Sequence, residues 1–337
     1  MKNFFLPIFV ITLFGCNKQT LNDTEISELA NDTEISESAS ALQRRCKDIT
    51  TINFTEPNLF PEGIEYDRHN DRFLVSSVTR GDIGIVNERG DYEVFIDDPA
   101  LTSTTGLEIN KSRNLLYVAN APGSVGVYHL NNGTRRRLIN LAALLPSAPI
   151  FVNDIALDPQ GNAYVTNSFS PVIYKITPDG TASIFFQNNA FATLPGQFGF
   201  NGIVYGNSNG GYLLVAFSRD NKIIKIPINN TSAFSDVMLD APLAGPDGLL
   251  LSKDGKQLSV VNNAGGSSAG KVQSFISTDK WHTASLANSY PTGAVFPTTA
   301  TSDGKDVFVL YAYLHLRATG RDVFTIQKVP LYKTNSY

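Results

Sequence analysis

Six short segments carry an oxygen-bearing side chain beside a small or acidic residue, at nearly constant intervals along the chain. They read Pro61-Glu62-Gly63-Ile64, Thr105-Gly106-Leu107, Val152-Asn153-Asp154-Ile155, Phe200-Asn201-Gly202-Ile203, Pro246-Asp247-Gly248-Leu249 and Pro297-Thr298-Thr299-Ala300. Counted from Gly63 through to Thr299, successive copies lie 43, 48, 48, 46 and 51 residues apart. Repeats of this length are typical of the blades of a β-propeller.

The oxygen-bearing residue of each copy is a candidate ligand for a hard cation. In chain order these residues are Glu62, Thr105, Asn153, Asn201, Asp247 and Thr298. Equivalent positions of successive blades meet at one end of a central channel, so these side chains are expected to converge. Two carboxylates and two amides favour Ca²⁺, and Mg²⁺ or Mn²⁺ also accept oxygen ligands. Zinc normally recruits histidine or cysteine, and neither occurs in these positions.

Short apolar runs separated by turns fill the intervals between the copies. Gly180, Gly255 and Gly304 each follow an aspartate, and Gly161 ends the turn 158–161, in sequences typical of tight hairpins. Helical periodicity is absent, apart from a turn or two near residues 142–145. We therefore predict an all-β fold: a six-bladed β-propeller with four-stranded blades around a central channel, spanning residues 48–337. Residues 49–54 are expected to complete the sixth blade, because an open ring would leave an unpaired sheet edge.

The first 15 residues read as an export signal, with Lys2 followed by the apolar run 4–14. The ending Leu13-Phe14-Gly15-Cys16 resembles a lipobox of the bacterial lipoprotein type, which implies lipidation of Cys16. The alternative is simple secretion with an incidental cysteine. With Asn17 next in the chain, we expect an exported protein anchored by lipid in the bacterial envelope, at the outer membrane and facing the periplasm or the outside.

Residues 16–47 form a polar, acidic segment of low complexity that is predicted to be a tether. It repeats one heptamer, at residues 22–28 and again at 31–37. The whole chain carries 27 basic and 31 acidic residues, and this balance argues against a nucleic-acid partner. Cys16 and Cys46 are the two cysteines, too few for a disulfide framework. We expect a monomer that contacts a membrane through its lipid anchor only.

The motifs resemble those of the family of gluconolactonase, senescence marker protein and luciferin-regenerating enzyme, and more distantly of the paraoxonases and strictosidine synthases. The resemblance covers nearly all of residues 48–337. It implies a catalytic divalent metal held by Glu62, Asn153, Asn201 and Asp247, each inside its own flanking motif and in the correct blade order. It further implies hydrolysis of a small-molecule lactone or ester, with Asp247 as both ligand and general base.

The chain departs from that family at Phe151. Family members often carry an arginine two residues before the first ligand asparagine, and an apolar residue there favours a less polar ester or lactone. Asp154 follows the ligand Asn153, and it either orients the ligand or the water, or caps the turn through its own backbone.

Further side chains are candidates for the pocket at the channel mouth. Thr105, Thr298 and Phe151 belong to it by their place in the motifs, while Asn120, Asn167 and Asn262 follow second strands and either approach the mouth or brace turns. Tyr311, Tyr313 and His315 alternate along a predicted strand, where packing between blades is the competing role. The glycine-rich segment 265–271 reads as a hairpin, and no Gly-x-Ser-x-Gly elbow is present.

Two functions remain open at this point. The first is a metal-dependent lactonase or esterase, a hydrolase acting on ester bonds. The second is a non-catalytic propeller, tethered to the cell surface and braced by calcium, that binds a protein or glycan. A catalytic site would keep one exchangeable coordination position, whereas a structural site would be closed by protein ligands.

Overall fold

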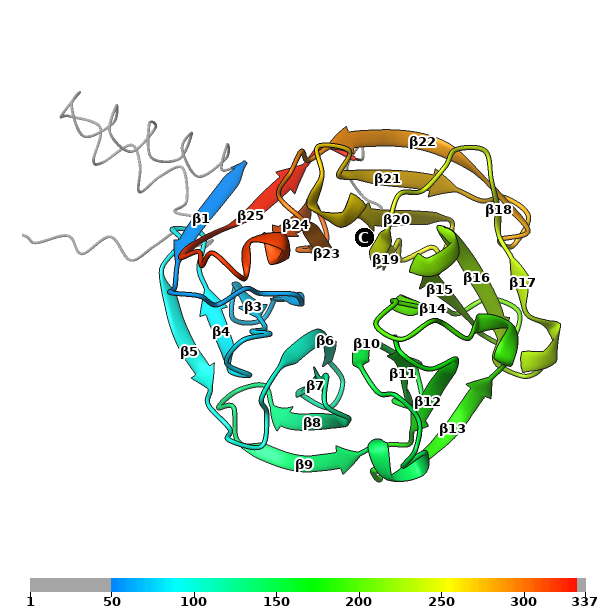
Figure 1. Ribbon diagram of the computed structural model, residues 1–337, viewed down its shortest axis with the longest axis horizontal. Coiled ribbons are helices and arrows are strands. Elements are labelled where there is room, and N and C mark those ends of the chain that lie inside the picture. The colour runs from blue at the N-terminus through cyan, green and yellow to red at the C-terminus, as the bar shows by residue number, and fades with distance from the viewer. Residues whose placement is uncertain (1–49, 332–337) are drawn as a thin grey trace, which may run out of the picture. The chain divides into compact units, whose positions relative to one another are not determined.

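Residues 50–331 form six sheets arranged around a central channel, and we describe this part of the chain in a computed structural model (Figure 1). The innermost strands contact one another in the cycle β2 (Ile64–Asp67), β6 (Thr104–Asn110), β10 (Val152–Leu157), β14 (Phe200–Gly206), β19 (Pro246–Leu251), β23 (Pro297–Ser302) and β2 again. The predicted six-bladed β-propeller is therefore confirmed. The predicted leader, Cys16, the tether and Cys46 lie outside the described residues.

Each blade adds three further strands outward from its innermost one, in chain order. The first blade adds β3 (Arg72–Val75), β4 (Ile83–Val86) and β5 (Tyr92–Ile96). The second blade adds β7 (Leu115–Asn120), β8 (Ser124–His129) and β9 (Arg135–Asn140). The third blade adds β11 (Ala163–Asn167), β12 (Val172–Ile176) and β13 (Ala182–Gln187). Blades four and five add β15 (Tyr212–Phe217), β16 (Lys222–Pro227) and β17 (Ser235–Asp236); and β20 (Gln257–Asn262), β21 (Lys271–Ile276) and β22 (Thr283–Pro291). The two-residue strand β18 (Met238–Leu239) pairs with β22 in parallel and makes the fifth sheet five-stranded.

The sixth blade is completed by the start of the described chain. Its sheet order is β1 (Thr51–Thr55), β25 (Val323–Val329), β24 (Val307–Tyr311), β23. Strand β1 pairs antiparallel with β25 along its whole length, from Thr51 opposite Gln327 to Thr55 opposite Val323. The predicted closing strand is thus confirmed for the described residues, and it covers the edge that β25 would otherwise expose.

Helical structure in residues 50–331 is limited to single turns of 3-10 helix. These are η1 (Ala142–Leu144), η2 (Asn189–Phe191), η3 (Ser218–Asp220), η4 (Thr231–Ala233), η5 (Ala264–Gly266) and η6 (Leu314–Leu316). The turn expected near residues 142–145 is confirmed by η1. None of these helices is long and apolar enough to cross a membrane.

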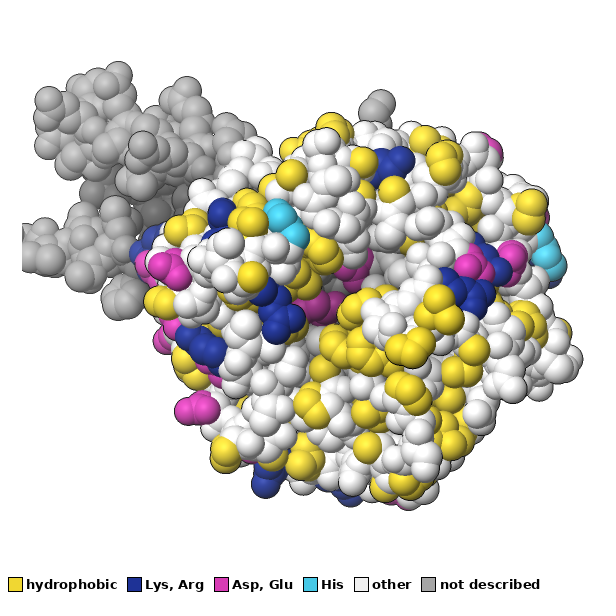
Figure 2. Space-filling model, in the orientation of Figure 1, with side chains coloured by type: hydrophobic (Ala, Val, Ile, Leu, Met, Phe, Trp, Pro, Cys, Tyr) yellow, Lys and Arg dark blue, Asp and Glu magenta, His cyan; other side chains and the backbone are white. Residues whose placement is uncertain are grey.

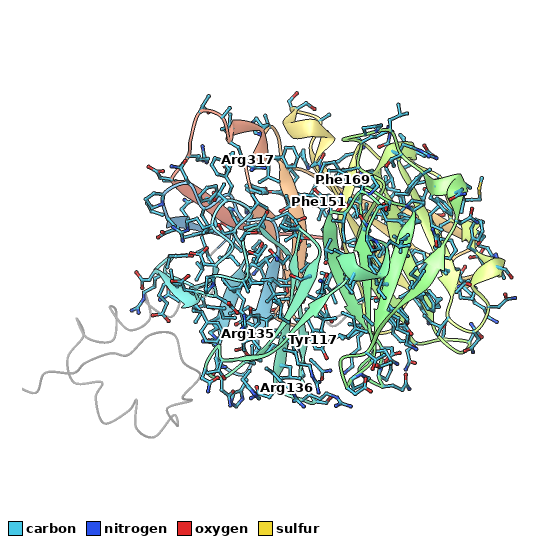
Figure 3. All side chains as sticks on the ribbon, turned by 60° about the horizontal axis from the view of Figure 1, so that its bottom comes forward. Tyr117, Arg135, Arg136, Phe151, Phe169 and Arg317 are labelled. Carbon is cyan, nitrogen blue, oxygen red and sulfur yellow. The ribbon has the colours of Figure 1, made fainter. Side chains whose placement is uncertain are left out.

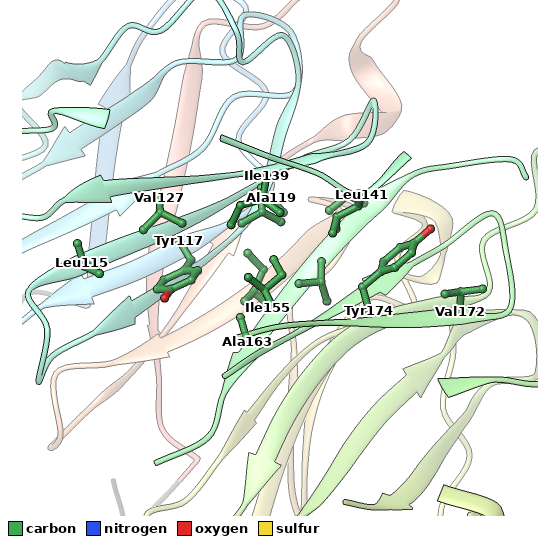
Figure 4. Close-up of a cluster of buried hydrophobic side chains, with 14 residues drawn as sticks. Leu115, Tyr117, Ala119, Val127, Ile139, Leu141, Ile155, Ala163, Val172 and Tyr174 are labelled. Atoms are coloured by element: carbon green, nitrogen blue, oxygen red, sulfur yellow. The ribbon is translucent and has the colours of Figure 1, made fainter. Parts of the chain in front are cut away.

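Alternation along the strands gives every inner strand two apolar faces. In β7, Leu115, Tyr117 and Ala119 pack toward the third blade, while Leu116 and Val118 pack toward the first. Figure 4 shows the first of these clusters, in which side chains of the second and third blades interdigitate. Because both faces of each sheet are buried in this way, the hydrophobic core lies between the blades as a series of separate layers.

In blades two to six the innermost strand includes the motif. One expectation about local structure was wrong. Tyr311, Tyr313 and His315 do not alternate on one strand, because β24 ends at Tyr311, Tyr313 has a left-handed backbone with φ of 52°, and His315 lies in η6.

Phe54 on β1 joins the closing strand to the first blade. It is 1% exposed, and its ring stacks on Tyr92 of β5 at 6.1 Å and packs against Phe324 of β25 at 6.0 Å. We expect Phe54→Ala to lower the free energy of unfolding by about 3–5 kcal/mol, since it leaves a cavity at the seam of the ring. Urea denaturation followed by fluorescence measures this change. Val94→Ala on β5, at a side chain 50% exposed, is the control, and equal losses for the two variants would contradict the role of Phe54.

Candidate functional site

A β-bulge at the start of five innermost strands places the motif residues. In the third blade Val152 pairs with Asn167 and Ile155 pairs with Val165, so Asn153 and Asp154 together lie opposite one residue. In β6, β14, β19 and β23 the pairing register with the second strand shifts in the same way after the first residue pair. A bulge twists the strand locally and re-aims the side chains of its unpaired residues. Thr105, Asn153, Asn201, Asp247 and Thr298 therefore hold equivalent positions, which we call the slot, and Glu62 holds it in the first blade.

Glycine follows the slot residue in four blades because the next blade comes too close for a side chain. A Cβ at Gly202 would overlap the carbonyl oxygen of Asp247, and a Cβ at Gly63 would overlap that of Thr105. Such close backbone approach is a recognised reason for glycine within a strand. The consequence is that slot residues of adjacent blades lie on backbones in direct contact.

Three polar residues just after the second strand of a blade hold the slot residue of the same blade. Asn153 Nδ2 donates to Ser168 Oγ at 3.0 Å, and Asn263 Nδ2 donates to Asp247 Oδ2 at 2.8 Å. In the fourth blade Ser218 Oγ accepts from the slot asparagine at 3.2 Å. The sequence reasoning missed these three residues, although Ser168, Ser218 and Asn263 share one position in the blade register.

The two slot asparagines keep an acceptor available. Asn153 and Asn201 are 3% and 5% exposed, and their amide nitrogens are used by the serines. Their Oδ1 atoms are buried without a hydrogen-bond partner, as is Oγ1 of Thr298. Buried oxygens are normally satisfied, so unpaired ones need an explanation such as an ion. Together with two carboxylates they form an all-oxygen donor set that fits a hard divalent cation.

The carboxyl groups of three different blades share this space. Burial raises the pKa of Glu62 well above its ordinary value, and the negative charges of Asp247 and Asp154 raise it further. Burial also raises the pKa of Asp247 to about 7, although hydrogen bonds from Asn263 and Asn201 lower it. The negative charge of Asp154 raises the pKa of Asp247 as well as that of Glu62, so these acids lie close enough to interact although they are far apart in the sequence.

Asp154 is engaged by backbone on both of its oxygens. Oδ1 accepts from the N–H of Ile155 at 2.9 Å, and Oδ2 accepts from the N–H of Ile203, on the fourth blade, at 3.0 Å. Burial raises its pKa to about 6 against the opposing effect of these two bonds. Of the two roles left open, the structure displays the capping of its own turn and adds a link between neighbouring blades.

A second pair of acids follows three residues after the slot in the first two blades. Burial raises the pKa of Glu65 to about 7, with the positive charge of Lys111 opposing the shift. Burial and the charge of Glu65 raise the pKa of Glu108 well above its ordinary value. The sequence reasoning missed both, although Glu65 lies only three residues after Glu62 in the chain. Among residues 50–331 no group of three or more His, Cys, Asp or Glu is placed to hold a metal.

The other pocket candidates are used in other ways. Asn120 Oδ1 accepts from the backbone N–H groups of Thr102 and Ser103 at 3.1 and 3.2 Å, and Asn167 and Asn262 make equivalent bonds. These three asparagines brace the loops that enter the innermost strands, which is the second of the two roles left open for them. Thr105 Oγ1 donates to the carbonyl oxygen of the residue before slot Asn153, at 3.0 Å. Phe151 lies on the same face as the slots, among other phenylalanines. The segment 265–271 lies between β20 and β21, as the predicted hairpin.

The face on which the innermost strands begin is hollowed at its centre (Figure 2). Acidic atoms lie in the hollow, and hydrophobic atoms gather along one side of it. The convergent carboxylates of the slots are consistent with this acidic floor.

Solved structures share this fold. The major allergen Mala s 1 of Malassezia sympodialis matches with a TM-score of 0.66 at 19% identity, over 83% of this chain and 95% of its own. A luciferin-regenerating enzyme matches with 0.61 at 12%, over 85% and 98%. A gluconolactonase of Xanthomonas campestris matches with 0.59 at 13%, over 83% and 89%. No family model matches the sequence, and no curated protein matches it. The resemblance inferred from the motifs is thus confirmed at the level of the six-bladed fold.

The raised carboxyl pKa values predict an unusual pH dependence for the metal-free protein. Asp154 and Asp247 have folded-state pKa values of about 6 and 7, above the value near 4 of an unfolded chain. The folded state therefore binds these protons more tightly, and its stability falls as the pH rises from about 5 to about 8. Urea denaturation in chelator at several pH values measures this fall.

Asp247→Asn removes one of the two titrating carboxyl groups, so the stability of this variant should fall less steeply as the pH rises. Asp91→Asn, at a side chain 69% exposed, should leave the slope unchanged. A metal-free stability that rises over this pH range would contradict the analysis.

Proposed function

We propose that the protein is a metal-dependent hydrolase of lactones or esters that works in the central channel. The observation that carries the proposal is that Asn153 and Asn201 each bury an unpaired amide oxygen, while the carboxylates of Glu62 and Asp247 are buried at the equivalent positions of two other blades. The names of structural neighbours support it, since gluconolactonases share the fold. Fold alone does not define function, so the weight rests on the donor set.

Calcium is the cation we assign to this donor set. Two carboxylates balance a double positive charge, and two amide oxygens complete four protein ligands. Mn²⁺ or Mg²⁺ would accept the same oxygens. When bound, the cation would polarise the substrate carbonyl and stabilise the negative charge that develops on its oxygen.

The chain's own residues orient the reacting groups and move one proton. In hydrolysis the oxygen of water bonds to the acyl carbon, and the bond from that carbon to the ring or alkoxy oxygen breaks. Asp247, which we assign as general base, takes the proton that the attacking water loses, and this proton passes to the released ring or alkoxy oxygen. Asn263 fixes Asp247 by holding its Oδ2 at 2.8 Å. Asp154 is the second acid, and it acts as a positioning residue through its bonds to Ile155 and Ile203.

Calcium binding tests the donor set directly. We expect Ca²⁺ to raise the melting temperature and to bind at one site by isothermal titration calorimetry. Glu62→Gln should raise the dissociation constant for Ca²⁺ at least about tenfold, because it removes one of two anionic ligands. Glu65→Gln removes a carboxylate three residues further along the chain, on β2, and should keep the affinity. Equal weakening by both variants, or no binding at all, would show that the ligand assignment is wrong.

Catalysis is tested with a panel of aliphatic and aromatic lactones and aryl esters, with Ca²⁺, with Mn²⁺ and after chelation. We expect metal-dependent turnover, and a loss of at least about 100-fold in kcat for Asp247→Asn, since a general base contributes about 10²–10⁴-fold. Circular dichroism checks that the variant is folded. Calcium binding and thermal stabilisation without turnover of any substrate would instead favour the calcium-braced binding propeller.

A further inference from the structure

Three phenylalanines from three separate loops pack against one another on the face where the innermost strands begin. Phe151 precedes β10, Phe169 lies between β11 and β12, and Phe198 precedes β14. Their ring centroids are 5.1, 5.1 and 5.2 Å apart, with interplanar angles between 52° and 74°. Figure 3 shows Phe151 and Phe169 close together near one end of the channel. We call these three rings the aromatic wall.

The aromatic wall does not serve the packing of the blades. Within residues 50–331, none of its three rings belongs to the five hydrophobic clusters that join successive blades from the first to the sixth. By contrast, Phe191, nearby in the chain, is 4% exposed inside one of those clusters. Phe198 is 40% exposed, and the loop that carries it also carries Leu194, which is 74% exposed. Large apolar side chains kept at the surface beside a polar hollow are typical of a binding site.

The wall is fixed to the slot residues by a short network of hydrogen bonds. Asn167, fully buried, accepts from the backbone N–H of Phe151 at 2.9 Å and from that of Phe169 at 3.1 Å. Ser168, the next residue, accepts from slot Asn153 at 3.0 Å through its hydroxyl. Its carbonyl oxygen accepts from the N–H of the residue after Phe198, at 2.8 Å. The rings are therefore pre-organised relative to the oxygens that converge in the channel.

We propose that the aromatic wall binds an aromatic ring of the substrate, so that the enzyme prefers aromatic lactones and aryl esters. This inference rests on the proposed hydrolase function, and it deepens it by naming the substrate class. The three rings meet in edge-on and tilted geometries, and a further ring adds to such a cluster favourably by the same contacts. A sugar lactone, rich in hydroxyls, would leave its polar groups without partners against three phenylalanines.

Two six-membered lactones that differ by a fused benzene ring give the sharpest test. Dihydrocoumarin carries the ring, and δ-valerolactone lacks it. Because their intrinsic reactivities differ, the informative quantity is the change in each kcat/KM on mutation. We expect Phe151→Ala and Phe198→Ala to lower kcat/KM for dihydrocoumarin at least about tenfold, mainly through KM, and for δ-valerolactone less than about threefold.

Two further variants control this experiment. Ile184→Ala on β13 removes a surface hydrophobic side chain, 38% exposed, away from the wall. It should leave kcat/KM unchanged for both substrates. Phe198→Tyr keeps the ring and should retain the preference. Equal losses for both lactones in the wall variants, or loss of the preference in Phe198→Tyr with the fold intact by circular dichroism, would overturn the proposal.

Binding separates the failure of this inference from failure of the hydrolase proposal. If neither lactone is hydrolysed, saturation-transfer NMR with dihydrocoumarin still reports contact with the wall. Binding by the parent protein that is lost in Phe151→Ala and Phe198→Ala would support the wall as an aromatic site while the hydrolase proposal fails. Absence of binding by the parent protein, or binding that is unchanged in both variants, would overturn the proposal that the wall binds an aromatic ring.

Discussion

Contact between the backbones of adjacent innermost strands is the constraint on which the rest of this structure depends. At the bulges, glycines such as Gly202 and Gly63 leave no room for a Cβ beside the next blade. A side chain there would push the blades apart and open the ring. The same contact holds the slots of successive blades close together, so the packing of the ring and the geometry of the site have one physical origin.

This closeness brings together like charges that repel one another. Glu62, Asp154 and Asp247 approach from three blades and are largely removed from water, and each has a raised pKa as a result. Two slot asparagines add carbonyl oxygens without partners. Such an arrangement opposes folding unless protons or a cation neutralise it, which is why we regard the donor set as built for a ligand and not for stability.

The hydrogen bonds around the slots show how a rigid scaffold supports a reactive centre. Ser168 contacts slot Asn153, the fourth blade and the loops that carry the aromatic wall. Asn263 gives the same kind of support to Asp247. Because these residues fix side chains that themselves face the channel, small changes in them are expected to move several groups at once.

The sequence by itself determined the all-β class, the number of blades, the closing strand and the register of the six slots, because a repeated motif forces equivalent residues into equivalent places. It did not identify Ser168, Ser218 or Asn263 as partners of the slots, and it left open whether Asn120, Asn167 and Asn262 approach the mouth or brace turns. A single asparagine after a strand has the same local signature whether it braces a loop or holds a carboxylate. Only the tertiary structure decided between these roles, and only it assembled Phe151, Phe169 and Phe198, because the direction of a side chain and its neighbours from other blades are set by the closed ring and not by the residues beside it in the chain.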